Sequence, residues 1–177
     1  MSALKSVIVG LGNPILSDDA AGIVVARRVY ESLNPDANVD FIEAGVGGFE
    51  LVEMLDGYDK AVMVDAMQTD RAFPGEFFLV DLLTAAPPEI PAMTHHAGLI
   101  EGLELARRLN MRVPRSVRVY GIEVEDIRTF GTSMTDAVAA AVPRMVEHIL
   151  SAEFSMLMRT RARTLSRRRL PTVQPPT

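Results

Sequence analysis

Short apolar runs alternate along the chain with longer segments whose apolar residues recur every three or four positions. The first pattern predicts β-strands and the second predicts amphipathic helices. The run Ala61–Asp65 is apolar without alternation, which is typical of a central strand covered on both faces. Strands are predicted at Leu4–Gly10, Val39–Ala44, Ala61–Asp65, Glu76–Asp81 and Val117–Ile122, and helices near Ala20–Leu33, Phe49–Leu55, Gly98–Asn110 and Ser133–Ala152.

The order of these elements predicts an α/β fold of three layers, in which a mostly parallel, twisted sheet of about five strands has helices on both faces. The 177 residues, 48% of them hydrophobic, suffice for one domain with its own core. We expect this domain to cover residues 1–152. Ser133 and Asp136 have the spacing of a capping box at the start of its last helix.

Charge is divided unevenly along the chain. Residues 1–150 contain 12 Lys and Arg against 22 Asp and Glu, whereas residues 151–177 contain six Arg against Glu153 alone. The acidic body argues against nucleic acid as a partner, since phosphate binding needs a basic face. Residues 153–177, whose arginines are followed by Pro171, Pro175 and Pro176, are predicted to form a flexible basic tail.

The composition also narrows the location and the chemistry. Cysteine is absent, which excludes disulfides, thiolate metal sites and a cysteine nucleophile. No apolar stretch approaches the roughly 20 residues of a membrane helix, and no secretory pattern precedes the first strand. We therefore expect a cytoplasmic protein without a membrane partner, and a monomer, because a domain of this size can bury its core alone. Serine-hydrolase and zinc-protease motifs are absent as well.

Residues that can carry chemistry follow several of the predicted strands. Asp18 and Asp19 follow the first strand, Asp65 ends the third, and His95 and His96 precede the third helix. In an open parallel sheet, ligands bind beyond the carboxyl ends of the strands where the strand order reverses, so these residues can meet in one crevice. Two carboxylates and an imidazole would bind a divalent metal such as nickel or zinc, and three protein ligands leave a coordination position open.

Structural roles are the alternative for each of these residues. An aspartate before a helix usually caps it, and we assign that role to Asp18, which leaves Asp19 without one. Asp65 could cap a turn, and a histidine pair before a helix is more often a surface feature. Only the joint placement of these residues favours a site.

The Gly10-Leu-Gly12 turn permits a second interpretation, a nucleotide- or metal-binding assembly factor without hydrolytic activity on a Rossmann-like sheet. The dinucleotide fingerprint requires a third glycine where this chain has Ile15, and Pro14 supplies no amide to a pyrophosphate. Glu43 stands where a ribose-binding acid could lie, which keeps this alternative open. Two further loops are noted. The flexible Gly45–Gly48 segment could be a plain strand-to-helix turn or a place where a peptide backbone approaches closely. The acidic residues Glu123, Glu125 and Asp126 could border the same crevice, but we interpret them as a solvated loop.

The opening segment Gly10-Leu-Gly-Asn-Pro-Ile-Leu-Ser-Asp-Asp-Ala-Ala-Gly22 resembles the signature of the hydrogenase maturation proteases. These nickel-sensing endopeptidases trim the C-terminal extension from the hydrogenase large subunit. The resemblance covers roughly residues 5–150 and excludes the arginine-rich tail. It continues through Glu43–Leu51, Val64–Ala66 and Thr94–Leu99, and more weakly through Gly121–Glu123 and Gly131–Ser133.

The resemblance implies that Asp19, Asp65 and His95 are the catalytic and metal-contacting residues, with the spacing to Gly98 favouring His95 over His96. The partner it implies is the hydrogenase large-subunit precursor, which carries the nickel, and no organic cofactor is implied. Either a carboxylate activates water as a general base, or the metal polarises water or the carbonyl. The chain departs from the family pattern at Ala20, where glycine is common, and at Val124, where proline is common.

Overall fold

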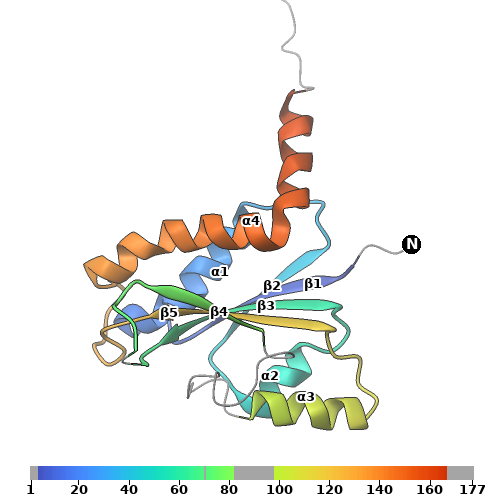
Figure 1. Cartoon of the computed structure of the whole chain (residues 1–177), viewed down its shortest axis with the longest axis horizontal. Helices are drawn as coiled ribbons and strands as arrows, with labels where there is room; N and C mark the ends of the chain where they lie inside the picture. Colours follow the sequence, from blue (N-terminus) through green and yellow to red (C-terminus); the bar gives the residue numbers. More distant parts are fainter. Residues whose placement is uncertain (1–3, 70, 82–97, 167–177) are drawn as a thin grey trace, which may run out of the picture.

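The computed structural model describes residues 4–69, 71–81 and 98–166 and confirms the predicted α/β architecture (Figure 1). Five strands form one sheet in the order β2-β1-β3-β5-β4, with helices on both of its faces. The elements in chain order are β1 (Ser6–Leu11), the 3-10 helix η1 (Ser17–Ala20), α1 (Ala21–Glu31), β2 (Val39–Ala44), α2 (Gly48–Met54), β3 (Lys60–Met67), β4 (Phe77–Asp81), α3 (Leu99–Arg108), β5 (Ser116–Glu123) and α4 (Asp136–Ser166).

Several predicted boundaries differ from the structure, and two of the differences concern the β5–α4 connection. Strand β5 runs one residue further than predicted and ends at Glu123. Helix α4 begins at Asp136, so its N-cap position is Thr135. Ser133 therefore lies two residues before that position, and the capping box predicted from Ser133 and Asp136 is wrong. The strand Val39–Ala44 agrees with its prediction at both ends.

The topology creates a switch point between β1 and β3. Strands β1, β2, β3 and β5 run parallel to one another, and only β4, beside β5, runs antiparallel. The chain leaves β1 for β2 on one side and then returns to β3 on the other side of β1. The strand order thus reverses between β1 and β3, where Gly10 is paired with Val64 near the carboxyl ends.

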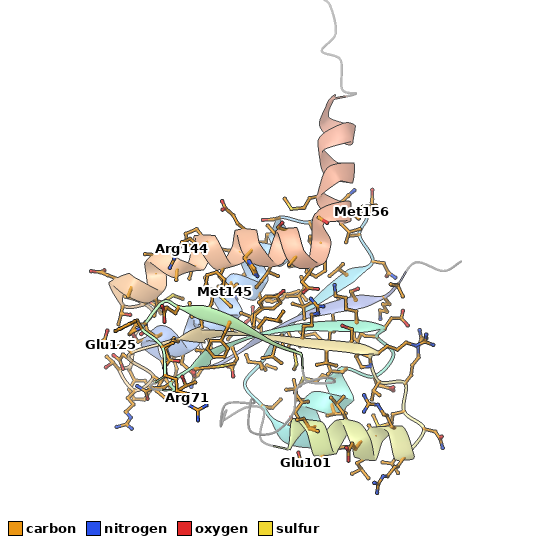
Figure 2. The ribbon with its side chains drawn as sticks, viewed as in Figure 1. Arg71, Glu101, Glu125, Arg144, Met145 and Met156 are labelled. Carbon is orange, nitrogen blue, oxygen red and sulfur yellow. The ribbon has the colours of Figure 1, made fainter. Side chains whose placement is uncertain are left out.

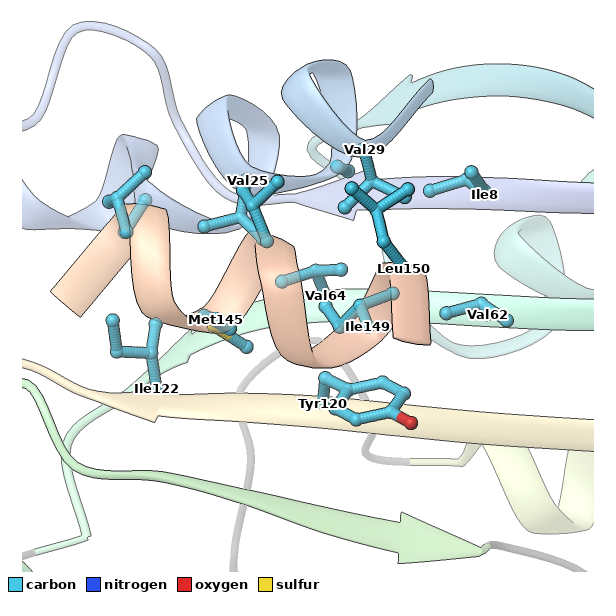
Figure 3. Close-up of a cluster of buried hydrophobic side chains, with 14 of the residues drawn as sticks. Ile8, Val25, Val29, Val62, Val64, Tyr120, Ile122, Met145, Ile149 and Leu150 are labelled. Carbon is cyan, nitrogen blue, oxygen red and sulfur yellow. The ribbon is translucent and has the colours of Figure 1, made fainter. Parts of the chain in front are cut away.

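Each face of the sheet is covered by one pair of helices. Helices α1 and α4 pack on one face and α2 and α3 on the other (Figure 1). Figure 3 shows the first of these two cores, in which strand residues meet α1 and α4. The labelled strand residues are Ile8, Val62, Val64, Tyr120 and Ile122, and the labelled helix residues are Val25, Val29, Met145, Ile149 and Leu150. Successive strand residues alternate between the two cores, as the geometry of a pleated strand requires.

Helix α4 continues past residue 152, where the sequence predicts the end of the domain. Its backbone kinks at Phe154 (φ −133°, ψ 16°), and the side chains of both Phe154 and Glu153 are buried. The Glu153 carboxylate pairs with Lys60 (2.6 Å) and Arg118 (2.9 Å), while the Tyr120 hydroxyl donates a hydrogen bond to it at 2.6 Å. Beyond the kink the helix leaves the sheet, and Met156 is exposed there (Figure 2).

Among the helices of the described segments, none combines the length and the apolar composition that crossing a bilayer requires.

Candidate active site

The first turn of α1 lies directly against the carboxyl ends of β1 and β3. A Cβ atom at Gly22 would lie 2.3 Å from the carbonyl oxygen of Leu11, 2.5 Å from that of Val64 and 3.1 Å from the Cα of Asp65. No side chain fits at these distances, so glycine is required for the contact. The segment that follows Asp19 is thereby brought against the backbone of Asp65 at the switch point.

Asp65 is a buried carboxylate on the α2–α3 face of the sheet. Its exposed fraction is 1%, and its neighbours in the alternation of β3, Met63 and Met67, belong to the core beneath α2 and α3. The residue paired with it on β5 is Gly121. Strand β3 continues for two residues past Asp65, so the interpretation of Asp65 as a turn cap is wrong. A carboxylate is rarely buried in a core unless it is paired or functional.

Asp19 lies within η1 and is held by the loop that precedes it. The backbone amide of Asn13 donates a hydrogen bond to its Oδ2 at 2.8 Å. Gly12 makes this fold possible, because its φ of +132° suits glycine and a Cβ there would lie 1.9 Å from the carbonyl oxygen of Asp19. The carboxylate is half-buried at the end of β1.

The same loop does not support the dinucleotide interpretation. The Asn13 amide, which a nucleotide-binding loop would offer to phosphate, is bonded to the carboxylate of Asp19. Glu43, the candidate ribose-binding acid, forms an ion pair with Arg27. This pairing raises the pKa of the Arg27 guanidinium, through its hydrogen bond with Glu43 first and the charge of Glu43 second.

The predicted role of Asp18 as the cap of the first helix is wrong. Neither η1 nor α1 has a side-chain cap, and Asp18 lies inside η1 rather than before it. Its fully buried carboxylate instead accepts hydrogen bonds from the amide and hydroxyl of Thr135, at 2.7 and 3.0 Å. The amides of Glu125 (3.2 Å) and Asp126 (3.0 Å) also donate to it. Asp18 therefore caps α4, which begins more than a hundred residues later.

Glu123 does not belong to a solvated acidic loop, contrary to the prediction. It is the buried last residue of β5, and it accepts hydrogen bonds from the amide (2.7 Å) and hydroxyl (2.6 Å) of Thr69. It is paired with Met67 in the register and so lies on the same face as Asp65. The apolar run ends at Ile122, which is why the predicted strand stops there and leaves Glu123 in the loop; the alternative that Glu123 borders the crevice agrees better with its burial.

The other two acidic residues of this connection do lie at the surface. Glu125 is exposed, at the same end of the molecule as Arg71 (Figure 2). Asp126 accepts hydrogen bonds from the amides of Arg128 (3.0 Å) and Thr129 (2.9 Å). A side-chain hydrogen bond with Thr129, together with these two amides, lowers the pKa of Asp126. For Glu125 and Asp126 the prediction of a surface loop is confirmed.

The predicted histidines, His95 and His96, lie outside the described residues. The described chain resumes at Gly98 (φ +78°), where a Cβ would lie 3.8 Å from the Cα of Gly48. The start of α3 thus lies beside the start of α2, on the same face of the sheet as the side chain of Asp65. Within the described segments, no group of three His, Cys, Asp or Glu residues is arranged to hold a metal ion. The three-residue set that includes His95 stays a prediction.

Comparison with known proteins identifies hydrogenase maturation proteases as relatives of this chain. The family model described as hydrogenase maturation protease (HycI) matches residues 23–152. The hydrogenase 2 maturation protease of Escherichia coli (strain K12) is 23% identical over 155 residues, which cover 84% of this chain and 90% of that protein.

Two solved structures have the same fold. The hydrogenase maturating endopeptidase HybD from E. coli aligns with a TM-score of 0.69 at 22% identity, over 86% of this chain and 94% of that one. The NiFe hydrogenase maturation protease HybD from Thermococcus kodakarensis aligns with a TM-score of 0.63 at 28% identity, over 84% and 98%. The match of the family model over most of the chain shows that the protein belongs to the hydrogenase maturation protease family and is a peptidase.

Proposed function

We propose that this protein is the endopeptidase that removes the C-terminal extension of a nickel-loaded hydrogenase large-subunit precursor. Family membership supports the reaction type and the class of substrate. The observation that carries the proposal is the contact of Gly22 with Asp65 at the switch point, which joins the segment after Asp19 to a buried carboxylate. The proposal places the reaction in the cytoplasm and assigns it to a monomer, as expected from the composition.

Asp19, Asp65 and His95 are the residues that we assign to the reaction. In this proposal they contact the nickel of the precursor and hold the scissile bond at the carboxyl ends of β1 and β3. Carboxylate and imidazole donors suit such a contact. Asp19 or Asp65 acts as the general base that takes a proton from the attacking water, unless the nickel of the substrate itself activates the water. No organic cofactor takes part.

The Gly45–Gly48 loop is proposed to hold the extended C-terminal segment of the substrate. It lies beside the loop of Asp19, since the Gly12 amide donates a hydrogen bond to the carbonyl of Ala44 at 3.2 Å. Among the described residues, a Cβ at Gly45 would contact the Gly12 carbonyl oxygen alone, at 3.6 Å, so a peptide backbone could approach closely there.

The test incubates the purified full-length protein with the cognate large-subunit precursor, with and without nickel, and measures the product by mass spectrometry. We expect shortening of the nickel-loaded precursor alone. Asp19→Asn, Asp65→Asn and His95→Ala should each lower the rate by about 100-fold or more, the range in which a general base contributes. His96→Ala is the matched control for the histidine, and Asp126→Asn for the carboxylates; both should cleave at the normal rate.

Two results would contradict the proposal in different ways. A nickel-loaded cognate precursor that keeps its full mass would reject the endopeptidase function. Normal cleavage by Asp65→Asn or His95→Ala would leave the function intact and reject the assigned residues. A loss of cleavage in His96→Ala with normal cleavage in His95→Ala would move the histidine by one position.

A further inference from the structure

Two connections far apart in the sequence form one backbone unit beside Asp19. Leu16, between β1 and η1, and Phe130, between β5 and α4, form an isolated antiparallel bridge. The amide of Gly131 donates a hydrogen bond to the carbonyl of Ile15 at 3.0 Å. We call Ile15, Leu16, Phe130 and Gly131 the docking ridge. Figure 1 shows the β5–α4 connection beside η1, at one end of the sheet.

The buried polar residues below hold this ridge in place. The amide of Asp18 donates to the carbonyl of Asp126 at 3.0 Å, and the hydroxyl of Ser17 donates to the carbonyl of Ser133 at 2.9 Å. The Asp18 carboxylate adds its bonds to Glu125, Asp126 and Thr135. Both sides of the ridge are therefore attached to the same buried carboxylate, so little conformational entropy is left to lose when a partner binds.

The crest of the ridge is apolar and open to solvent. Phe130 is 79% exposed and Ile15 is 55% exposed, whereas Leu16 is half-buried. Opposed residues of an antiparallel bridge point to one face, so Phe130 and Leu16 share one side of the ridge and Ile15 takes the other. A single exposed apolar residue is ordinary. Here two exposed apolar residues lie on the two sides of one firmly held ridge, and the exposed charged residues Glu125 and Arg128 are close to Phe130 in the sequence. This is the composition of an interface core and its rim.

We propose that this ridge docks the protein substrate by entering an apolar groove of the large-subunit precursor, with Phe130 and Ile15 contacting the opposite walls of that groove. The inference rests on the proposed function, because it names the surface that recognises the precursor. Ile15 and Asp19 belong to the same short connection, so the ridge is continuous with the candidate active site. A second copy of this chain bound to the ridge would cover the β1–η1 connection and block access of the substrate to Asp19. We therefore assign the ridge to the precursor.

The test compares Ile15→Ser, Phe130→Ser and the double variant with the wild-type protein on the nickel-loaded precursor. We expect KM to rise by about tenfold for each single variant and further for the double variant, with kcat unchanged, as for apolar anchors of a protein interface. The matched control is Leu109→Ser, because Leu109 is 59% exposed and follows α3. Leu109 is close in the sequence to Arg112, whose amide donates a hydrogen bond to Asp56. Asp56 precedes β3, so this region lies at the opposite end of the strands from Asp19. This control should keep the wild-type KM, and all variants should keep the wild-type melting temperature.

The outcomes separate this inference from the function on which it rests. If the wild-type protein leaves the precursor uncut, the proposed function fails and the ridge has no substrate. If the wild-type protein cuts it and the ridge variants keep the wild-type KM, the docking role is rejected alone. A lower kcat at unchanged KM also rejects docking. Sedimentation analysis tests the remaining alternative. If the wild-type protein is a dimer and Phe130→Ser dissociates it, the ridge binds a second copy of the chain and the inference is overturned.

Discussion

The carboxylate of Asp18 accepts two hydrogen bonds from Thr135, one from its amide at 2.7 Å and one from its hydroxyl at 3.0 Å. The two residues lie 117 positions apart in the sequence. This contact connects the segment that carries Asp19 to the start of α4. It gives the candidate site a rigid support that does not depend on any of the proposed catalytic residues.

Asp18→Asn should destabilise the protein strongly. Whichever oxygen is replaced, the new amide group faces a partly buried N–H donor that loses its acceptor in the buried Asp18 site. A donor left unsatisfied away from water costs about 1–3 kcal/mol. We expect a loss of about 3 kcal/mol and, for a chain of this length, a melting temperature lower by roughly 6–12 °C. Thermal unfolding followed by circular dichroism measures the change. Asp126→Asn is the control, because the amides released in that surface loop can bond to water; an equal loss in both variants would contradict the prediction.

Gly22→Ala should damage both the fold and the candidate site. The added Cβ would meet the carbonyl oxygens of Leu11 and Val64 at 2.3 and 2.5 Å, so α1 must move away from the sheet. Overpacking of this kind typically costs about 1–3 kcal/mol. Gly131→Ala is the matched control, since a Cβ there has no atom of the described segments within 4 Å. Denaturant unfolding measures the stability of both variants.

The same glycine variant also reports on the site. Because the movement of α1 displaces the segment after Asp19 relative to Asp65, cleavage of the precursor at a temperature where the variant is folded should fall as well. A fully stable Gly22→Ala protein with the wild-type rate would contradict the close packing at the switch point.

The ion cluster around Glu153 predicts a specific response to acid. Burial by itself would raise the pKa of Glu153, but hydrogen bonds from Lys60 and Tyr120 and the charge of Lys60 outweigh it, and the net result is a pKa below the usual value. A carboxyl whose pKa is lowered by folding stabilises the protein above its unfolded pKa of about 4.3. That contribution is lost as the pH falls through the lower pKa of the folded state, because the unfolded chain binds the proton first.

We therefore expect the free energy of unfolding to decrease from about pH 5 toward pH 3, and to decrease less steeply in Glu153→Gln. Urea unfolding at several pH values measures both slopes. Lys60→Met supplies the comparison, since it keeps the carboxyl and removes its nearest cation, and it should lower the stability at neutral pH. Identical slopes for wild type and Glu153→Gln would show that this cluster does not contribute to acid unfolding.

Several parts of the fold could be predicted from the sequence because they depend on local patterns. The apolar run of β3 and the periodic apolar positions of α1 require burial on particular faces, whatever the partners are. The order of strands and helices then leaves few topologies beyond a mostly parallel sheet. The sequence also identified Asp65 as the residue near the end of the third strand, since strand and carboxylate are adjacent in the chain.

The boundaries and the roles of neighbouring acids depended on distant contacts. Asp18 and Asp19 are adjacent aspartates, and no local rule distinguishes them. Asp18 is the buried cap of α4, whereas Asp19 is half-buried and bonded to Asn13. Glu123 became a buried partner of Thr69 only because the sheet continues to that residue. Glu153, predicted to lie in a basic tail, is buried because Lys60 and Arg118 of two other strands meet it at the kink of α4.

The sequence by itself thus determined the class of fold, the family resemblance and the candidate residues Asp19, Asp65 and His95, all of which follow from local pattern and motif. The tertiary structure decided which carboxylate supports the fold, how Gly22 brings α1 against Asp65, and that Ile15 and Phe130 share one ridge. The physical reason is that burial and hydrogen bonding are properties of the groups that meet in space, and in a sheet with crossover connections those groups come from distant parts of the chain.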